Sequence, residues 1–287
     1  MAVRTTGSYK TLRAKTLRVV TLNLWGDNGP WADRLALVGD ELAALTPDVV
    51  TLQEVRDVPG RVPNQAAVLA ERLGFRYVFA ESTAWGGGRE GLAVVSRFPI
   101  GEHEARPLPH STETEGRIVL SARIDTDDGQ IWVHTTHLSF RESEGANRED
   151  QVLFVDEVVT AHKNDNIQIV TGDFNASPPY DEIRWMTGLC TLGGRRVAYQ
   201  DAWERLYPGL PGLTWASANP YVATMYWLRP DRRLDYVFVT PMRRDRRGTI
   251  HAVHVVLDKE NAAGIRASDH YGVLADIQIV PEPVPGV

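Results

Sequence analysis

The sequence contains a single cysteine, Cys190, among 287 residues. One thiol cannot form an internal disulfide, and it also excludes zinc sites built from several cysteines. No stretch approaches the roughly 20 apolar residues that a transmembrane helix needs. Residues 1–20 are polar and basic and lack the apolar core and small-residue cleavage site of a secretory signal. We therefore expect a soluble, cytoplasmic protein without a disulfide framework.

The chain also lacks an excess of positive charge, because 31 Lys and Arg residues stand against 37 Asp and Glu residues, for a net charge of −6. This balance disfavours a protein that is held on nucleic acid by bulk positive charge. The charges are unevenly spread, however, since residues 229–247 carry seven arginines against three aspartates. Such a local basic rim could steer a phosphate-bearing substrate. Solvated loop arginines are the alternative.

Hydrophobic residues make up 43% of the chain, enough for a full-sized core. Strand patterns occur at residues 17–25, 48–55, 75–80, 91–98, 117–125, 131–139, 167–174, 234–240, 249–257 and 271–280, and helical periods at 31–45, 64–73 and 146–163. No repeat or linker divides them. We therefore expect a single domain over residues 16–281, with a flexible basic N-terminal tail at 1–15 and a Pro-rich C-terminal tail at 282–287.

The fold class follows from one turn. The segments 117–125 and 131–139 are joined by the residues TDDGQ, a hairpin signal that requires antiparallel pairing. A purely parallel Rossmann or barrel sheet is therefore disfavoured. The number of strands is sufficient for two sheets, and the helices are available for outer layers. We expect an α/β (α+β) fold, a four-layer helix/sheet/sheet/helix sandwich with two mixed, largely antiparallel sheets.

Polar residues occupy the ends of several apolar strands, where a sequence that only builds a core would not place them. They are Asn23, Glu54, His137, Asp173, Asn175, Asp235, Asp269 and His270. Each alone has an ordinary explanation as a solvated strand end, a turn or a structural histidine. Together they supply carboxylates as hard oxygen ligands for Mg²⁺, histidines for proton transfer and amides for phosphate oxygens. The set indicates phosphodiester hydrolysis.

These residues lie in short stretches that carry a resemblance. The stretches are TLNLW at 21–25, LQEV at 52–55, THL at 136–138, GDFN at 172–175, LDYV at 234–237 and SDHY at 268–271. In this order the chain resembles the endonuclease/exonuclease/phosphatase superfamily, which includes pancreatic deoxyribonuclease, neutral sphingomyelinases, inositol polyphosphate 5-phosphatases and tyrosyl-DNA phosphodiesterases. One tetrapeptide is a weak signal, but the ordered set is a strong one. The resemblance implies the same four-layer sandwich.

The resemblance also implies a metal site. Glu54, helped by Asn23, would bind a divalent metal, and Asp269 would lie near it. The expected ion is Mg²⁺, with Mn²⁺ as the alternative, and one or two ions are both compatible with the sequence. The metal would serve the hydrolysis of a phosphoester.

The remaining residues would act at the phosphorus. Asp173 would orient or activate the attacking water, while Asn175 and His137 would hold the phosphoryl oxygens as negative charge develops. His270 would be the second histidine, oriented by a carboxylate, with Asp235 as the favoured partner. The sequence leaves open whether Asp173 or His270 is the general base.

Two further residues receive weaker interpretations. Glu90 stands directly before the strand at 91–98, where some members of the superfamily place a carboxylate that supports the active-site histidine. A Glu exposed at the start of a strand is the alternative. His134 lies three residues before His137, so the two side chains point to opposite faces of a strand, and we expect His134 to be structural.

The expected substrate is phosphate-bearing, such as DNA or its end adducts, so nucleic acid is a candidate partner and a monomer is the default. The residues TW at 214–215 and NP at 219–220, followed by the Arg-rich stretch, are similar to the tyrosyl-DNA phosphodiesterase branch, although Trp215 has a core-packing alternative. A sphingomyelinase-like lipid phosphodiesterase would use the apolar segment 221–228 as a membrane hairpin. The sequence also leaves open an inositol-phosphate phosphatase and a non-catalytic binding protein on the same fold.

Overall fold

The computed structural model describes residues 15–111, 115–222 and 231–282. Both predicted tails lie outside this part of the chain except for Lys15 and Glu282. These two residues form an ion pair, with 3.0 Å between Lys15 Nζ and Glu282 Oε1. The division into one domain and two tails stays a prediction.

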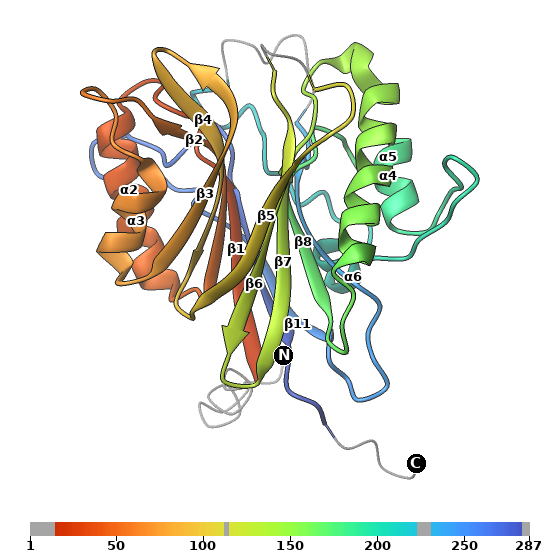
Figure 1. The fold of residues 1–287 in the computed structure, drawn as a ribbon. Coiled ribbons are helices and arrows are strands. Elements are labelled where there is room, and N and C mark those ends of the chain that lie inside the picture. The colour runs from red at the N-terminus through yellow and green to blue at the C-terminus, as the bar shows by residue number, and fades with distance from the viewer. Residues whose placement is uncertain (1–14, 112–114, 223–230, 283–287) are drawn as a thin grey trace.

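Two six-stranded sheets form the centre of the molecule (Figure 1). The first contains, in spatial order, β11 (Ile250–Val256), β12 (Gly272–Gln278), β1 (Thr16–Asn23), β2 (Val49–Asp57), β4 (Gly88–Ser96) and β3 (Arg76–Trp85). The second contains β5 (Ile100–Pro107), β6 (Ile118–Thr126), β7 (Gly129–His137), β8 (Gln168–Asp173), β10 (Asp235–Val239) and β9 (Gln200–Asp201). Both sheets are mixed, because β1 with β2 and β7 with β8 are parallel pairs among antiparallel ones.

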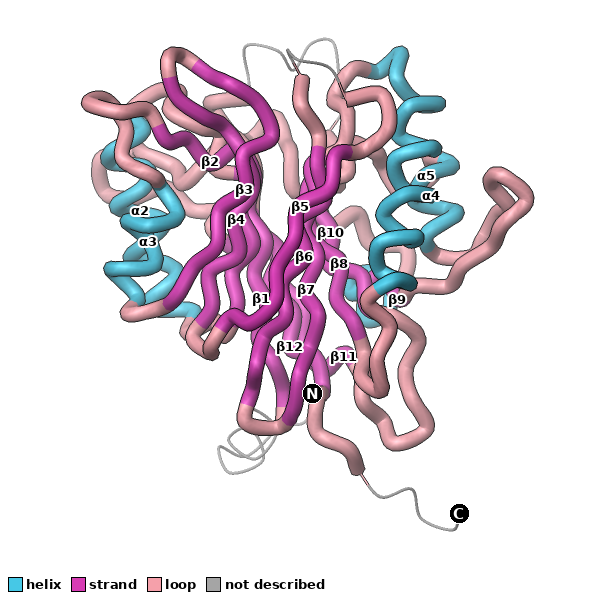
Figure 2. The backbone as a smooth tube through the Cα atoms, in the orientation of Figure 1, coloured by secondary structure: helices cyan, strands magenta, loops and turns pink. Residues whose placement is uncertain are grey.

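Helices cover the outer faces of the two sheets, as Figure 2 shows. They are α2 (Trp31–Leu45) and α3 (Gln65–Leu73) on the first sheet, and α4 (Gly145–Ala161) and α5 (Asp181–Met186) on the second, with the 3-10 turn η1 (Glu142–Glu144) and the short helix α6 (Ala202–Leu206) in connections. This arrangement confirms the predicted four-layer sandwich. Among the described residues, no helix has the length and apolar character needed to span a membrane.

Local sequence signals set the ends of the helices. The side chain of Asn64 caps α3 by accepting a hydrogen bond of 3.1 Å from the amide of Ala67. The same helix ends at Gly74, whose φ of +68° is a left-handed conformation that glycine adopts without strain. The observed bounds of α3 therefore lie within one residue of the helix predicted at 64–73.

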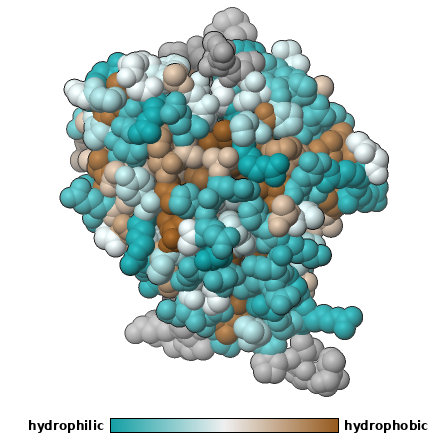
Figure 3. Space-filling view, in the orientation of Figure 1, coloured by the Kyte–Doolittle hydropathy of each residue, from teal (hydrophilic) through white to brown (hydrophobic). Residues whose placement is uncertain are grey.

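The core has three layers of buried apolar side chains. The central one lies between the sheets and includes Val19, Val94, Val133, Ile169 and Val237. The other two fill the space between each sheet and its helices. The outer surface is more polar than these layers. Figure 3 shows hydrophilic side chains over most of one face, with hydrophobic ones in smaller groups. Burial of the three layers supplies the main force that holds the sandwich together.

The predicted hairpin is present, since β6 and β7 pair antiparallel from Val119↔Thr136 to Thr126↔Gly129. The strand directions bring the ends of several strands to one edge of the sandwich. The carboxyl ends of β1, β2, β7 and β8 meet there, together with the amino ends of the antiparallel strands β10 and β12. This edge collects the polar residues that the sequence places at strand ends.

Candidate functional site

A cavity of about 470 Å³ opens at this edge of the two sheets. Seven of the predicted site residues line it, namely Glu54, Glu90, His137, Asp173, Asn175, Asp269 and His270. The other two lie directly behind the wall, because Asn23 is hydrogen-bonded to Glu54 and Asp173, and Asp235 is hydrogen-bonded to His270. The fold therefore brings all nine residues together from segments that are far apart in the sequence.

Asp173 and Asp235 face each other on neighbouring strands. They are register partners in the antiparallel pair β8–β10, and each is 1% exposed. Two carboxylates buried side by side in this way would repel each other strongly. His270 lies against both, with 2.8 Å from its Nδ1 to Asp235 Oδ2 and 3.7 Å from its Nε2 to Asp173 Oδ2. The imidazole therefore joins the two acids.

The charges of this group shift its proton affinities. Burial alone would lower the pKa of His270, but the carboxylates of Asp235 and Asp173 raise it well above its usual range. Burial raises the pKa of Asp173, while the charge of His270 opposes the rise. These charges therefore favour the protonated form of His270, which lies between the two acids.

His137 and Asn175 lie on the other side of Asp173. His137 is the register partner of Asp173 in the parallel pair β7–β8, and its Nε2 lies 3.5 Å from Asp173 Oδ2. Burial lowers the pKa of His137 well below its usual range, and the nearby charges of Arg117 and His270 act in the same direction. Asn175 has a left-handed φ of +49°, and its amide donates to Asp173 Oδ1 over 2.9 Å. This tight turn holds the Asn175 side chain at the cavity wall.

Glu54 reaches the cavity through an irregularity in β2. The register of β2 against β4 shifts between Leu52 and Val55, and Glu54 has a φ of +53°. Such a bulge turns consecutive side chains in new directions. Gln53 accordingly points between the sheets, where its Nε2 donates to Thr21 and Thr135, and Glu54 points into the cavity.

A pair of carboxylates at the cavity fits a divalent metal. Burial raises the pKa of Asp269 to about 6, and the charge of Glu54 adds to the rise while His270 opposes it. A cation between the two acids would relieve this repulsion, and hard oxygen donors suit Mg²⁺. Asn23 stands beside them, with its Nδ2 donating to Glu54 Oε1 over 3.2 Å. The predicted ligand residues therefore have the donor chemistry that the ion requires.

A second group also has the spacing of metal ligands. Asp173, Asp235 and His270 offer ligand atoms within 4.8 Å of one another. The hydrogen bond between His270 and Asp235 already engages two of these residues, however, and the buried imidazolium would repel a cation. The charge of His270 therefore disfavours a cation in this group, and Glu54 and Asp269 stay the predicted metal ligands.

Glu90 differs from the expectation that it supports a histidine. Its carboxylate forms an ion pair with Arg56, which is its register partner across β2 and β4. Arg56 is buried, so its charge needs an acid nearby, and Glu90 is directly opposite. The guanidinium of Arg56 also lies over the ring of Trp85, 4.0 Å from its centroid. Glu90 thus lines the cavity while holding an arginine.

Three residues brace the site, and sequence reasoning missed Arg34 and gave no bracing role to Thr214 and Asn219. Arg34, on α2, is 2% exposed and donates to the carbonyls of Leu24 and Ala267 over 2.8 and 2.9 Å. It thereby ties the loop after β1 to the loop before β12. Thr214 Oγ1 accepts from the amide of Asp235, and Asn219 Nδ2 donates to the carbonyl of Ser268. The motifs at 214–215 and 219–220 were the sequence signals for Thr214 and Asn219.

Other sequence interpretations are resolved by the fold. His134 is fully buried, with 2.8 Å between its Nδ1 and Ser121 Oγ and 2.9 Å between its Nε2 and Gln168 Oε1, as expected for a structural residue. Trp215 is 4% exposed and packs with Val222 and Leu234, so the core-packing alternative holds, although it also borders the cavity.

The Arg-rich stretch 229–247 does not form one rim. Arg232, before β10, lines the candidate cavity, whereas Arg243, Arg244 and Arg247, after β10, lie at the other end of the strand. The apolar segment 221–228 lies outside the described residues except for Tyr221 and Val222.

A four-layer sandwich with a histidine–carboxylate cluster and paired acids at one edge defines the class of phosphoester hydrolases. The chain belongs to the Endonuclease/Exonuclease/phosphatase family, whose model matches residues 20–270. This confirms the family that the ordered motifs predicted.

The relatives of this chain include a phospholipase C and a tyrosyl-DNA phosphodiesterase. The chain is 27% identical to the inositol phosphosphingolipids phospholipase C of Schizosaccharomyces pombe over 318 residues, which cover 95% of this chain and 71% of that protein. It is 25% identical to the tyrosyl-DNA phosphodiesterase 2 of Danio rerio over 265 residues, which cover 90% of this chain and 65% of that protein. The crystal structure of the latter with a single-strand DNA product has the same fold, with a TM-score of 0.73 and 22% identity over 92% of this chain and 99% of that one.

Proposed function

We propose that this protein is a divalent-metal-dependent phosphodiesterase whose catalytic centre is the cavity at the sheet edge. The observation that carries this proposal is the placement of His270 between Asp235 and Asp173, 2.8 and 3.7 Å away, beside the paired acids Glu54 and Asp269. A buried imidazolium suits a reaction in which negative charge develops on phosphoryl oxygens.

Glu54 and Asp269, with Asn23 behind them, would hold the ion, which we propose to be Mg²⁺. When bound, the ion would act as a Lewis acid on a phosphoryl oxygen. The protein contributes the rigidity of the site, since Glu54 is fixed by the β2 bulge and Asn23 by hydrogen bonds to Glu54 and Asp173. Arg34 further restrains the two loops that carry these ligands.

Asp173 is the better candidate for the general base. The raised pKa of His270 favours its protonated form, which cannot accept a further proton. Asp173 Oδ2 faces both histidines and accepts from Asn23 Nδ2 over 3.1 Å, which fixes its direction. Asp173 would take a proton from the attacking water, while His270, oriented by Asp235, would donate a hydrogen bond to a phosphoryl oxygen.

His137 and Asn175 would complete the contacts to the phosphoryl group. His137 is neutral, because its pKa is lowered by burial, and a neutral imidazole can donate one ring N–H to an oxygen. The Asn175 Nδ2 donates one hydrogen to the carbonyl of Leu138 over 3.1 Å and keeps a second for the substrate. Both donors would strengthen their bonds as charge develops on the oxygens.

The mouth of the cavity favours a single-stranded nucleic acid as substrate. Trp85 and Phe140 both line it and are 44% and 43% exposed, so two large aromatic side chains are available to a ligand there. Arg56 and Arg141 lie over these rings, with 4.0 and 5.0 Å to the centroids. Aromatic faces beside guanidinium groups can stack bases and attract phosphates. The similarity to the fish tyrosyl-DNA phosphodiesterase is consistent with this substrate.

A sphingolipid phosphodiester is the second candidate. It is favoured by the similarity to the fission-yeast phospholipase C, which extends over 95% of this chain. Exposed aromatic side chains at a cavity mouth also suit a membrane interface. Both candidates use the same cavity and the same proposed chemistry, so they differ only in what binds at its rim.

The test is hydrolysis by the full chain with Mg²⁺ of 5′-tyrosyl and unmodified single-stranded DNA, sphingomyelin and inositol phosphates. We expect turnover of a DNA substrate that is abolished by chelator and lowered by at least about 10²-fold in Asp173→Asn. Asp181→Asn, an exposed acid on α5, is the matched control. Equal turnover in Asp173→Asn would refute the catalytic assignment, whereas turnover of sphingomyelin alone would refute the nucleic-acid substrate.

The rim has its own test. Phe140→Ala should raise KM for single-stranded DNA by about tenfold, because base–aromatic stacking contributes about 1–3 kcal/mol per base. Its kcat on a small chromogenic diester should stay unchanged. A KM for DNA equal to that of the wild type would remove the stacking argument.

A further inference from the structure

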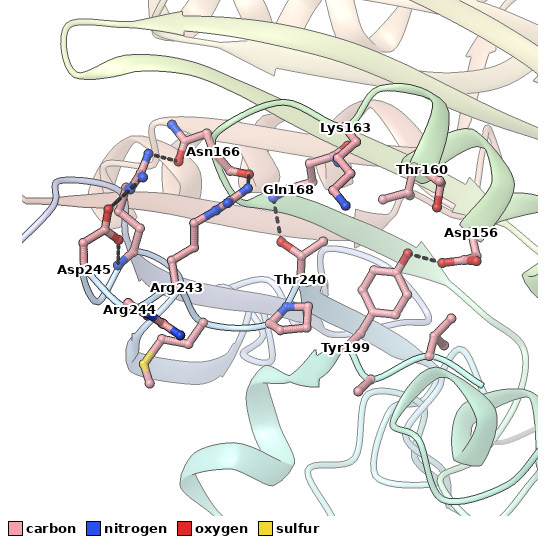
Figure 4. A pocket seen from close by; sticks show the side chains of 16 residues that line it. Asp156, Thr160, Lys163, Asn166, Gln168, Tyr199, Thr240, Arg243, Arg244 and Asp245 are labelled. Carbon is pink, nitrogen blue, oxygen red and sulfur yellow. Dashed lines mark hydrogen bonds and ion pairs between the residues drawn. The ribbon is translucent and has the colours of Figure 1, made fainter.

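A second, larger cavity lies at the opposite end of β8 and β10 from the candidate site (Figure 4). Its volume is about 760 Å³. The walls come from the C-terminal end of α4, the segment before β9 and the loop between β10 and β11. β10 starts at Asp235 in the candidate site and leads to Thr240 in this wall, about 17 Å away at about 3.4 Å per residue. One small ligand therefore cannot occupy both cavities.

The charged residues of this cavity leave an excess of positive charge. Its two acids already have cationic partners: Asp156 pairs over 2.6 Å with Arg195, which also pairs with Glu157, and Asp245 pairs with Arg247 over 2.7 Å. Lys163 and Arg244 also line the cavity and are exposed to it, and within the described ranges neither forms an ion pair with an acid. An anion would therefore meet two available cations.

A third cation in this wall is held in a fixed position. The Arg243 Nη2 donates to the main-chain carbonyls of Asn164 and Asn166 over 3.0 and 2.5 Å. The Arg243 amide donates to the carbonyl of Arg247 over 2.9 Å, which closes the loop on itself. A guanidinium that is ordered in advance loses little freedom when a ligand binds. Figure 4 shows Lys163 on one side of the cavity and Arg243 and Arg244 on another.

The lining also contains polar residues, namely Thr160, Asn166, Gln168 and Thr240, and a set of apolar ones. The apolar residues include Val159, Val197, Ala198, Pro241 and Met242. The ring of Tyr199 joins them, and its hydroxyl is turned away to donate to Asp156 over 2.8 Å. Cations and apolar side chains in one cavity match a ligand with an anionic group and an apolar body. The volume lies in the range of small-molecule sites.

We propose that this cavity binds an organic phosphate, an anion in which a phosphate or phosphonate group carries an aromatic or aliphatic body. The phosphate lies between Lys163, Arg243 and Arg244, and the apolar body lies against Tyr199 and its neighbours. This site is separate from the candidate catalytic centre and does not depend on the function proposed for it.

The test uses phenylphosphonate, which has the required anion and ring but no ester bond that a hydrolase could cleave. Its affinity for the full chain is measured by calorimetry, and its position by hydrogen exchange of the peptides that cover residues 160–168 and 240–249. We expect wild type to bind it and to protect both peptides. Lys163→Gln/Arg244→Gln should bind at least about tenfold more weakly, because hydrogen bonds to two charged groups are lost.

The matched control is Arg205→Gln/Lys259→Gln, which removes the same charges from exposed positions elsewhere. This control and His270→Ala should retain the protection of both peptides. Equal affinity in Lys163→Gln/Arg244→Gln, or protection confined to the strand ends at the candidate site, would overturn the proposal. Inorganic phosphate that binds as tightly as phenylphosphonate would also overturn it, because the apolar wall would then contribute nothing.

Discussion

Replacement of Asp235 by asparagine tests the electrostatic role of the candidate site in a single step. Asp235 is fully buried, and its Oδ2 accepts from His270 Nδ1 over 2.8 Å. Asparagine keeps the shape and an acceptor oxygen but removes the charge. Asp235 is the strongest of the groups that raise the pKa of His270, so burial, which lowers that pKa, should prevail in the variant. We expect the pKa of His270 to fall and the imidazole to become neutral near pH 7.

The effect on turnover follows from the same change. A hydrogen bond from a charged donor contributes about 1.5–3 kcal/mol, against about 0.5–1.5 kcal/mol from a neutral one. The loss of about 1–1.5 kcal/mol in the transition state corresponds to about tenfold in kcat. Loss of the imidazole's orientation adds to this, and removal of one preorganised donor commonly lowers kcat by about 10²- to 10³-fold. We therefore expect a fall of between about ten- and a thousandfold.

Two assays measure this prediction on the same protein. NMR titration of the histidine ring protons follows the pKa of His270, with buried His134 as an internal reference. Hydrolysis of a chromogenic diester gives kcat. Asp181→Asn, which removes an exposed carboxylate, should change neither quantity. A folded Asp235→Asn variant with the wild-type titration of His270 and the wild-type kcat would refute the reasoning.

Four further predictions concern the metal, acid stability and the backbone of the site. Glu54→Ala should weaken Mg²⁺ binding by at least about tenfold in calorimetry, since the ion loses a charged ligand, and unchanged binding would place the metal elsewhere. In wild type, Mg²⁺ binding should be about tenfold weaker at pH 5 than at pH 8. Asp269 has a pKa raised to about 6, so it is mostly protonated at pH 5. Equal affinity at both pH values would contradict this. Burial lowers the pKa of His134 to about 4 in the folded protein, against 6.5 in the unfolded chain. As the pH falls, the unfolded state therefore takes up a proton first. The free energy of unfolding should decrease as the pH drops from about 6.5 to about 4. Urea unfolding should show a smaller loss in His134→Gln over this interval, and an equal loss would count against it. Gly172→Ala should destabilise the fold by more than about 2 kcal/mol in urea unfolding, because Gly172 has a φ of +135° and a Cβ there would overlap the carbonyl oxygen of Thr136; an unchanged midpoint would show that β7 and β8 can move apart.

The layers of the fold and the cluster of polar strand ends could be predicted because both follow from periodic patterns. Buried strands such as β1 and β8 are rich in apolar and β-branched residues, and an amide or carboxylate at the end of such a strand is conspicuous. The order of strands turns these ends into one site. The predicted hairpin between β6 and β7 was enough to exclude a parallel sheet.

The elements that were missed carry no such pattern. β5 (Ile100–Pro107) is an edge strand with mostly exposed, charged side chains, so it lacks apolar alternation. The bulge that directs Glu54 depends on the pairing of β2 with β4, which no local motif encodes. Arg34 occupies a helix position that a polar residue normally presents to solvent, and its burial depends on two distant loops.

The pairing of Glu90 with Arg56 has a similar cause. The sequence shows only that a glutamate precedes an apolar strand, whereas its partner is chosen by the register of β2 against β4. The separation of the Arg-rich stretch into two ends of β10 likewise required the strand itself, because charge counted along the sequence does not show direction in space.

The central claim is that His270 and a divalent metal act together on a phosphodiester in the cavity at the sheet edge. The most direct measurement is the rate of hydrolysis of bis(4-nitrophenyl) phosphate with Mg²⁺ by wild type and by His270→Ala, each with and without chelator. We expect hydrolysis by wild type that chelator abolishes and that His270→Ala lowers by at least about 10²-fold without loss of the folded state. Hydrolysis at the wild-type rate in His270→Ala, or hydrolysis that survives the chelator, would contradict the account.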